Sequence, residues 1–134
     1  MSKNLTTGVT PELNGSGQRI ALICARWNEV IVNRLENGAR EALVNAGVAE
    51  GDIVSIKVPG ALEIPIAMKA ALASGAFDAA IALGVVLRGD TYHFEVVSNE
   101  SASGVMRVGL DSGQVVTNGI LTVDTEAQAD ERSV

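Results

Sequence analysis

The stretch Ile20-Ala21-Leu22-Ile23-Cys24-Ala25 is apolar at every position, which is typical of a strand that is buried on both faces of a sheet. A helical pattern follows it. Asn28 is placed to cap that helix and Gly47 to end it in a left-handed conformation. One apolar stripe with helical spacing runs between them: Ile31, Leu35, Ala39, Ala42, Leu43 and Ala46. The stretch therefore predicts a strand followed by a covering helix.

The same strand–helix unit recurs three more times along the chain. Residues 52–58, 79–86 and 115–123 predict the further strands, and residues 63–73 and about 91–110 predict the helices between them. Pro65 falls in the first turn of the second helix, where a missing N–H matters least, and Thr91 is the candidate cap of the third. Thr125-Glu126-Ala127-Gln128 has the spacing of a capping box that opens a fourth helix.

The segment from Val115 to Leu121 has a second interpretation. Asn118-Gly119 within it is a strong signal for a two-residue hairpin turn, so the segment could form two short antiparallel strands. We favour one strand, because the three preceding strand–helix units make a parallel sheet the consistent continuation. Right-handed crossovers then predict a three-layer α/β/α sandwich around a four-stranded parallel sheet.

Composition and charge narrow the class of protein. The 134 residues suit one domain, which we place at residues 18–134. Residues 1–17 are polar and without a period, and we expect either an N-terminal arm onto a neighbour or a disordered start. The net charge of −6, with no Lys/Arg cluster, argues against a nucleic-acid partner. Apolar runs fall well short of the ~20 residues that span a bilayer.

The content of cysteine and histidine narrows the class of protein further. Cys24 is the only cysteine and His93 the only histidine, which excludes an internal disulfide, fits a reducing compartment and argues against a structural zinc site. The residues after Met1 lack the apolar core of a signal peptide. We therefore expect a cytoplasmic protein that associates with neither membrane nor nucleic acid.

Ligands of parallel α/β sheets bind outside the carboxyl ends of the strands, and the loops there contain the unusual residues. His93 would lie in the first turn of the third helix, whose dipole disfavours the imidazolium form. Gly89-Asp90-Thr91 just before it could cradle an anion with backbone N–H groups. An ordinary surface histidine and an ordinary glycine loop explain the same residues.

Three further residues each allow two interpretations. Trp27 suits stacking on a heterocycle as well as packing. Glu63 fits a ligand contact or a first-turn acid favoured by the helix dipole, and Arg132 fits a phosphate contact or an exposed helix arginine. The sequence has no Walker loop, no dinucleotide glycine fingerprint and no Gly-x-Ser-x-Gly elbow. This argues against the usual nucleotide-binding proteins and Ser-His-Asp hydrolases.

The order of these segments resembles the lumazine synthase family of riboflavin biosynthesis. The resemblance covers roughly residues 18–132, in order and spacing, through the following motifs: ARWN (25–28), VPGALEIP (58–65), LGVVLRGDTYHFE (83–95), NGILT (118–122) and EAQADER (126–132). It implies a flavodoxin-like fold and pentamers, or multiples of pentamers, with active sites between adjacent subunits.

The resemblance also implies an activity. This is the condensation of 5-amino-6-(D-ribitylamino)uracil with 3,4-dihydroxy-2-butanone 4-phosphate to 6,7-dimethyl-8-ribityllumazine, phosphate and water, without a metal or an organic cofactor. It makes His93 the general acid/base, Trp27 the ring that stacks on the pyrimidine, and Asn118 a residue that completes the pocket of a neighbouring subunit. The resemblance assigns phosphate binding to Asp90, Thr91 and Arg132. It assigns the remaining substrate contacts to Ala61, Leu62, Glu63, Val85, Val86 and Leu87.

The chain departs from the family pattern at two places. Leu62 stands where a phenylalanine is more usual. The chain ends at Val134, where a longer terminal helix carrying a lysine is usual, so the fourth helix would have only about two turns. We expect this C-terminal helix to be truncated. Two other functions fit the same fold: a non-catalytic pentameric ligand-binding or shell scaffold, and a pentameric riboflavin synthase that dismutates lumazine.

Overall fold

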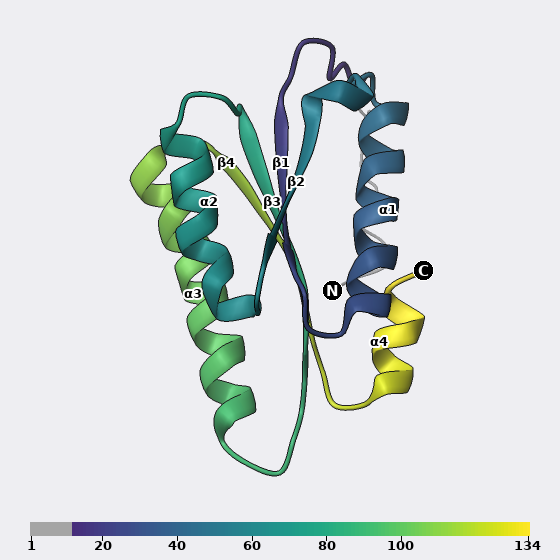
Figure 1. Ribbon diagram of the computed structural model, residues 1–134, viewed down its shortest axis with the longest axis vertical. Coiled ribbons are helices and arrows are strands. Elements are labelled where there is room, and N and C mark those ends of the chain that lie inside the picture. Colours follow the sequence, from purple (N-terminus) through teal and green to yellow (C-terminus); the bar gives the residue numbers. More distant parts are fainter. Residues whose placement is uncertain (1–11) are drawn as a thin grey trace.

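The computed structural model describes residues 12–134, which form one parallel sheet with helices on both faces (Figure 1). The strand order is β2-β1-β3-β4, so the predicted α/β sandwich is confirmed. The strands are β1 (Ile20–Ala25), β2 (Ile53–Val58), β3 (Ala79–Leu87) and β4 (Val115–Val123). The helices are α1 (Glu29–Asn45), α2 (Ile64–Ala73), α3 (His93–Ser112) and α4 (Glu126–Arg132), with short 3₁₀ turns η1 (Glu50–Asp52) and η2 (Ala61–Glu63).

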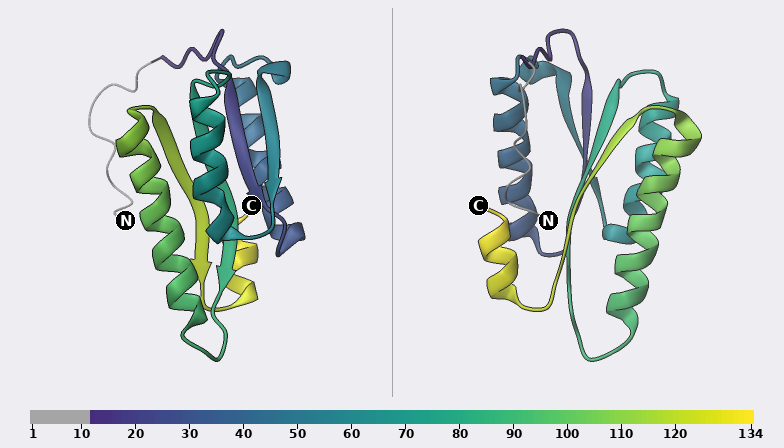
Figure 2. Two further views of the ribbon diagram at one scale, coloured as in Figure 1. Left: turned by 60° about the vertical axis from the view of Figure 1, so that its left-hand side comes forward. Right: turned by 180° about the vertical axis from the view of Figure 1, so that it is seen from behind.

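Two hydrophobic cores lie on opposite faces of the sheet. Helices α2 and α3 cover one face, and α1 and α4 cover the other (Figure 2). Alternate residues of β1 supply both cores, because successive side chains of a strand point to opposite faces: Ile23 packs toward α2 and α3, and Leu22 packs toward α1. All six residues of β1 are buried, as the unbroken apolar run predicts.

The predicted N-terminal arm is only partly described. Residues 1–11 lie outside the described residues. Residues 12–17 form no helix or strand, and the backbone N–H of Gly15 donates a hydrogen bond of 2.7 Å to the carbonyl of Ala46 at the end of α1.

The segment 115–123 is one strand, so the hairpin alternative is wrong. It pairs in parallel with β3 along its whole length, from Ala79 opposite Val115 to Leu87 opposite Val123. The backbone therefore passes through Asn118-Gly119 without turning, and the loop that follows β4 lies at the same end of the sheet as the loops that follow β1, β2 and β3.

The predicted helix ends agree with the structure only in part. Thr125 and Gln128 form the reciprocal capping box of α4, and Gly47 is left-handed with φ 101°, so both predictions are confirmed. Asn28 occupies the N-cap position of α1, as predicted, but its side chain makes no capping hydrogen bond; its amide Nδ2 donates instead to the carbonyl of Val85, 3.4 Å away on β3. Thr91 is not the cap of α3, because that helix begins one residue later, with Tyr92 at the cap position.

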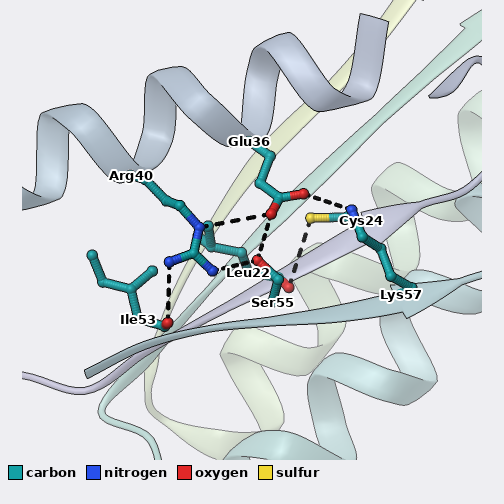
Figure 3. Close-up of polar contacts among 7 residues, drawn as sticks. All are labelled: Leu22, Cys24, Glu36, Arg40, Ile53, Ser55 and Lys57. Atoms are coloured by element: carbon teal, nitrogen blue, oxygen red, sulfur yellow. Dashed lines mark hydrogen bonds and ion pairs between the residues drawn. The ribbon is translucent and has the colours of Figure 1, made fainter. Parts of the chain in front are cut away.

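A cluster of polar side chains joins α1 to the edge strand β2 beside the buried sulfur of Cys24 (Figure 3). The Glu36 carboxylate accepts hydrogen bonds from Lys57 Nζ at 2.6 Å and from Ser55 Oγ at 2.7 Å. Arg40 Nη2 donates to the same Ser55 hydroxyl at 2.7 Å. Burial raises the pKa of the Cys24 thiol to about 12, and the neighbouring Glu36 adds to the rise. The thiol therefore stays protonated at neutral pH.

We expect Glu36→Gln to lower the free energy of unfolding by about 1–2 kcal/mol at neutral pH, because it removes a charge that accepts two hydrogen bonds. Burial alone would raise the pKa of Glu36, but the hydrogen bonds from Lys57 and Ser55 lower it overall from 4.5. A lowered folded pKa stabilises the protein above the unfolded pKa, and this stability is lost as the pH falls through the folded pKa.

The difference between the wild type and Glu36→Gln should therefore be constant above about pH 5 and shrink below about pH 4.5. Urea unfolding at a series of pH values and one protein concentration measures it. Glu41→Gln, an exposed acid on the same helix, is the matched control and should show no such trend. A difference for Glu36→Gln that does not shrink as the pH falls below about 4.5 would contradict the prediction.

Candidate active site

A cavity of about 330 Å³ lies at the carboxyl ends of β1 and β3. These strands are neighbours, but α1 after β1 and α3 after β3 cover opposite faces of the sheet (Figure 2). Such a switch point opens a crevice between the two loops, where parallel α/β sheets bind their ligands. The cavity is lined by Ala25, Trp27, Asn28, Gly60, Ala61, Leu62, Glu63, Val85, Val86, Leu87, His93, Phe94 and Val97.

Backbone hydrogen bonds hold the first two loops of the cavity side by side. Arg26 N–H donates to the carbonyl of Val58 at 2.8 Å, and Trp27 N–H donates to the carbonyl of Pro59 at 3.3 Å. A Cβ on Gly60 would lie 3.3 Å from Cε3 of the Trp27 indole, so the glycine lets the ring pack against the second loop. Trp27 remains 68% exposed, which leaves much of the indole free to meet a planar ligand.

Asn28 also lines the cavity, although its sequence pattern alone predicts only a helix cap. Its φ of 62° makes it the one non-glycine residue with positive φ in the described part of the chain, and asparagine is among the residues that tolerate this conformation best. The turn sends the chain from β1 into α1, and the side-chain amide donates to the carbonyl of Val85 on β3. Asn28 thus connects the two strands that flank the cavity.

The third side of the cavity comes from β3 and α3. Val85, Val86 and Leu87 end β3, and His93 is the first residue of α3. His93 lines the cavity and remains exposed to solvent, so a group bound there could exchange protons with it. Phe94 and Val97, which also went unpredicted, lie on the same helix and pack against the core below.

The predicted residues fall into three groups. Those that line this one cavity are Trp27, Ala61, Leu62, Glu63, Val85, Val86, Leu87 and His93. Asp90 and Thr91 lie in the exposed loop just before His93 and do not line it. Two others lie elsewhere: Asn118 lines a separate hollow between β4 and α3, and Arg132 is exposed on α4, where its Nη1 donates to the carbonyl of Gln128 at 3.4 Å. Within one chain these two do not share the cavity of His93.

Within residues 12–134, histidine, cysteine and acidic side chains nowhere gather in a group of three or more that could hold a metal ion. In the same range, each helix is too short or too polar to cross a membrane.

Comparison with known proteins identifies the family. The profile of 6,7-dimethyl-8-ribityllumazine synthase matches residues 17–134. The chain is 52% identical over 121 residues to the 6,7-dimethyl-8-ribityllumazine synthase of Ralstonia pickettii (strain 12J), which covers 90% of this chain and 73% of that protein. It is 50% identical over 121 residues to the protein of the same name from Cupriavidus metallidurans, covering 90% and 72%. For that of Paraburkholderia phytofirmans the identity is 50% over 119 residues, covering 89% and 71%. Matches of this length and identity show that the chain belongs to the 6,7-dimethyl-8-ribityllumazine synthase family.

Proposed function

We propose that this chain condenses 5-amino-6-(D-ribitylamino)uracil with 3,4-dihydroxy-2-butanone 4-phosphate to give 6,7-dimethyl-8-ribityllumazine, phosphate and water. The observation that carries the proposal is that one cavity gathers an exposed indole, Trp27, and the only histidine, His93, at the switch point of the sheet. Family membership over most of the chain supports it.

The cavity suits the pyrimidine. Its lining is largely apolar, with Val85, Val86 and Leu87 on one side and the turn of residues 60–63 on another, so a flat ring can replace water against aliphatic side chains and the indole. The backbone and Glu63 supply polar groups for its edge. Leu62 keeps an apolar wall where the family more usually has phenylalanine.

The loop before α3 suits the phosphate of the ketone. Asp90 and Thr91 stand at the N-terminus of a 20-residue helix, where the dipole and unpaired backbone N–H groups attract anions. A Cβ on Gly89 would meet nothing within 4 Å, so the backbone there is open to a ligand. His93 is the first residue of that helix, two positions after Thr91, so we expect it to lie between the bound phosphate and the pyrimidine.

The chemistry needs protons to move at several steps. The primary amine attacks the ketone and loses water to form an imine, phosphate is eliminated, and tautomerisation gives a carbonyl. The ribitylamino nitrogen then closes the ring on this carbonyl with loss of a second water. We assign these transfers to His93, since a positioned acid/base contributes about 10²- to 10⁴-fold. Holding both reactants in register supplies much of the remaining acceleration.

We further propose that the protein acts as an oligomer, a pentamer or a multiple of one, with each active site between two subunits. Asn118 and Arg132 lie apart from His93 within one chain, so a neighbouring subunit must bring them to it. An apolar surface supports this: Met106, Leu110 and Val115 around the hollow of Asn118 are 62%, 75% and 64% exposed, and contiguous exposed apolar surface marks protein–protein contacts.

The assay is the appearance of lumazine after both substrates are mixed with protein, corrected for the spontaneous reaction. We expect formation above the uncatalysed rate. Ligand binding without turnover would instead indicate the scaffold alternative. Supplying lumazine alone tests the other alternative, because only a riboflavin synthase would convert it to riboflavin.

We expect Arg132→Ala to raise KM for the phosphorylated ketone about tenfold, as loss of one charge-assisted hydrogen bond to phosphate does. KM for the pyrimidine amine should stay within about twofold, because the guanidinium is assigned to the other substrate. Steady-state kinetics with each substrate varied in turn measures both. An unchanged KM for the ketone would refute the assignment.

Mixed oligomers test whether the site is shared between subunits. Chains with His93→Ala and chains with Arg132→Ala are unfolded together and reassembled. If the two residues come from different subunits, some mixed sites contain both native side chains and activity rises above that of either variant alone. If they come from one subunit, every site lacks one of them and activity does not recover.

A further inference from the structure

Arg88, the residue directly after β3, makes three side-chain contacts. Its Nε donates to Oδ1 of Asp124 at 2.6 Å, and its Nη1 donates to Oε1 of Glu95 at 2.5 Å. Its guanidinium carbon lies 4.3 Å from the centre of the Phe94 ring, within the range of a cation–π contact. One side chain therefore contacts the first turn of α3 and the loop after β4.

Asp124 leads into the helix that carries Arg132. Its backbone N–H donates to the Gln128 side chain at 2.7 Å, beside the capping box of Thr125 that starts α4. A bond between Arg88 and Asp124 therefore fixes the start of α4 relative to the loop that follows β3.

That loop has few other anchors. Residues 89–92 are exposed, and in the part of the chain that the structure describes they make no hydrogen bond to another loop or strand. The Thr91 hydroxyl accepts only from His93 N–H, at 3.4 Å. By contrast, Arg88 also donates its backbone N–H to the carbonyl of Val123 at 2.9 Å. Arg88 thus holds the loop on its β3 side through both its backbone and its side chain.

The charges around Arg88 indicate a structural use of its cation. One guanidinium stands between two carboxylates, and its hydrogen bond holds the pKa of Glu95 below the ordinary value, so the group is ionised at neutral pH. The three charges sum to −1. Both donors that face the carboxylates are occupied, which makes Arg88 a poor candidate for a phosphate ligand in its own right.

We propose that Arg88 is a positioning residue, which holds the phosphate-binding loop 89–92 against the start of α4 and so sets where the phosphorylated ketone binds. This inference rests on the proposed function. Arginine is needed because two separate nitrogens of one rigid plane reach two carboxylates and the plane covers an aromatic ring, whereas lysine offers a single ammonium.

The test compares four variants with the wild type. Arg88→Ala should raise KM for the phosphorylated ketone about tenfold, because small displacements of a binding group are costly, while KM for the pyrimidine amine stays within about twofold. Arg88→Lys should recover only part of this. Asp124→Asn and Glu95→Gln each weaken one contact and leave the arginine in place, and each should give a smaller rise.

The matched control is Arg19→Ala. Arg19 is also an exposed arginine paired with an aspartate, Asp78, and its side chain is 48% exposed against 47% for Arg88, but it lies at the opposite end of the sheet. Its kinetics should match the wild type. The double variant Arg88→Ala/Asp124→Asn should be no worse than Arg88→Ala alone, since both act through one contact.

The outcomes separate this inference from the proposed function. A wild-type protein that makes no lumazine would contradict the proposed function. A wild type that turns over, with Arg88→Ala showing an unchanged KM for the ketone or an equal rise in both KM values, overturns the role of Arg88. If Arg88→Ala does not fold, the two carboxylate variants decide, and wild-type KM values in both would overturn it as well.

Discussion

Replacement of His93 by alanine is expected to lower kcat by about 10²- to 10⁴-fold, the usual contribution of a positioned acid/base. His93 is an exposed side chain at the first residue of α3, so its loss should leave folding and assembly unchanged. The cavity keeps its indole and aliphatic walls, and KM values should change little compared with kcat. The variant would then lose proton transfer and keep substrate binding.

The measurement is kcat at saturating concentrations of both substrates, with the size of the assembly checked by size-exclusion chromatography. His93→Asn keeps a polar side chain but cannot carry a proton near neutral pH, so it should be as slow as the alanine variant. Asn99→Ala, an exposed position on the same helix that does not line the cavity, is the control. Wild-type turnover in His93→Ala would remove this residue from the mechanism.

The position of the cavity was predictable, because one rule about parallel sheets selects one end of every strand. That rule places Trp27, Glu63 and His93 at one edge without any knowledge of distances, and the structure lines one cavity with them. Val97 was predictable on similar grounds, since it follows His93 by four residues and shares its helical face. Loop position and helical period are local properties that a sequence displays directly.

The contacts that the sequence did not reveal are made between distant segments. Asn28 resembles an ordinary helix cap, and only the packing of β1 beside β3 shows that its amide reaches Val85. Arg88 likewise resembles a loop arginine until Asp124, 36 residues later, lies beside it. One folded chain does not bring Asn118 and Arg132 to His93. The places that we propose for them depend on a second chain, which the pattern of a single sequence does not describe.

The dipeptide Asn118-Gly119 shows how one residue type can have two physical causes. Glycine in a hairpin supplies a positive φ, but Gly119 is not among the glycines with positive φ. A Cβ on Gly119 would lie 2.8 Å from the carbonyl oxygen of Ala82 and 2.9 Å from Cδ2 of Leu83. The glycine at position 119 lets β4 approach β3 closely. The sequence Asn-Gly alone does not distinguish this reason for a glycine from a hairpin turn.

Gly119→Ala is accordingly expected to lower the free energy of unfolding by about 2–3 kcal/mol. The added methyl group would meet a backbone oxygen, which cannot move aside by a change of rotamer as a side chain can. Val116 of the same strand packs closely against Gly109 of α3 on one face of the sheet, which limits how far β4 can shift to relieve the contact. Gly84→Ala is the matched control on the next rung of the ladder, where a Cβ would find ordinary contacts of 3.4 Å or more. That variant should be neutral or more stable by about 0.4–1 kcal/mol, as the alanine restricts the unfolded chain. Denaturant midpoints of the two variants at one protein concentration decide the matter. Equal stability of the two would show that the close approach of β4 to β3 is not why residue 119 is glycine.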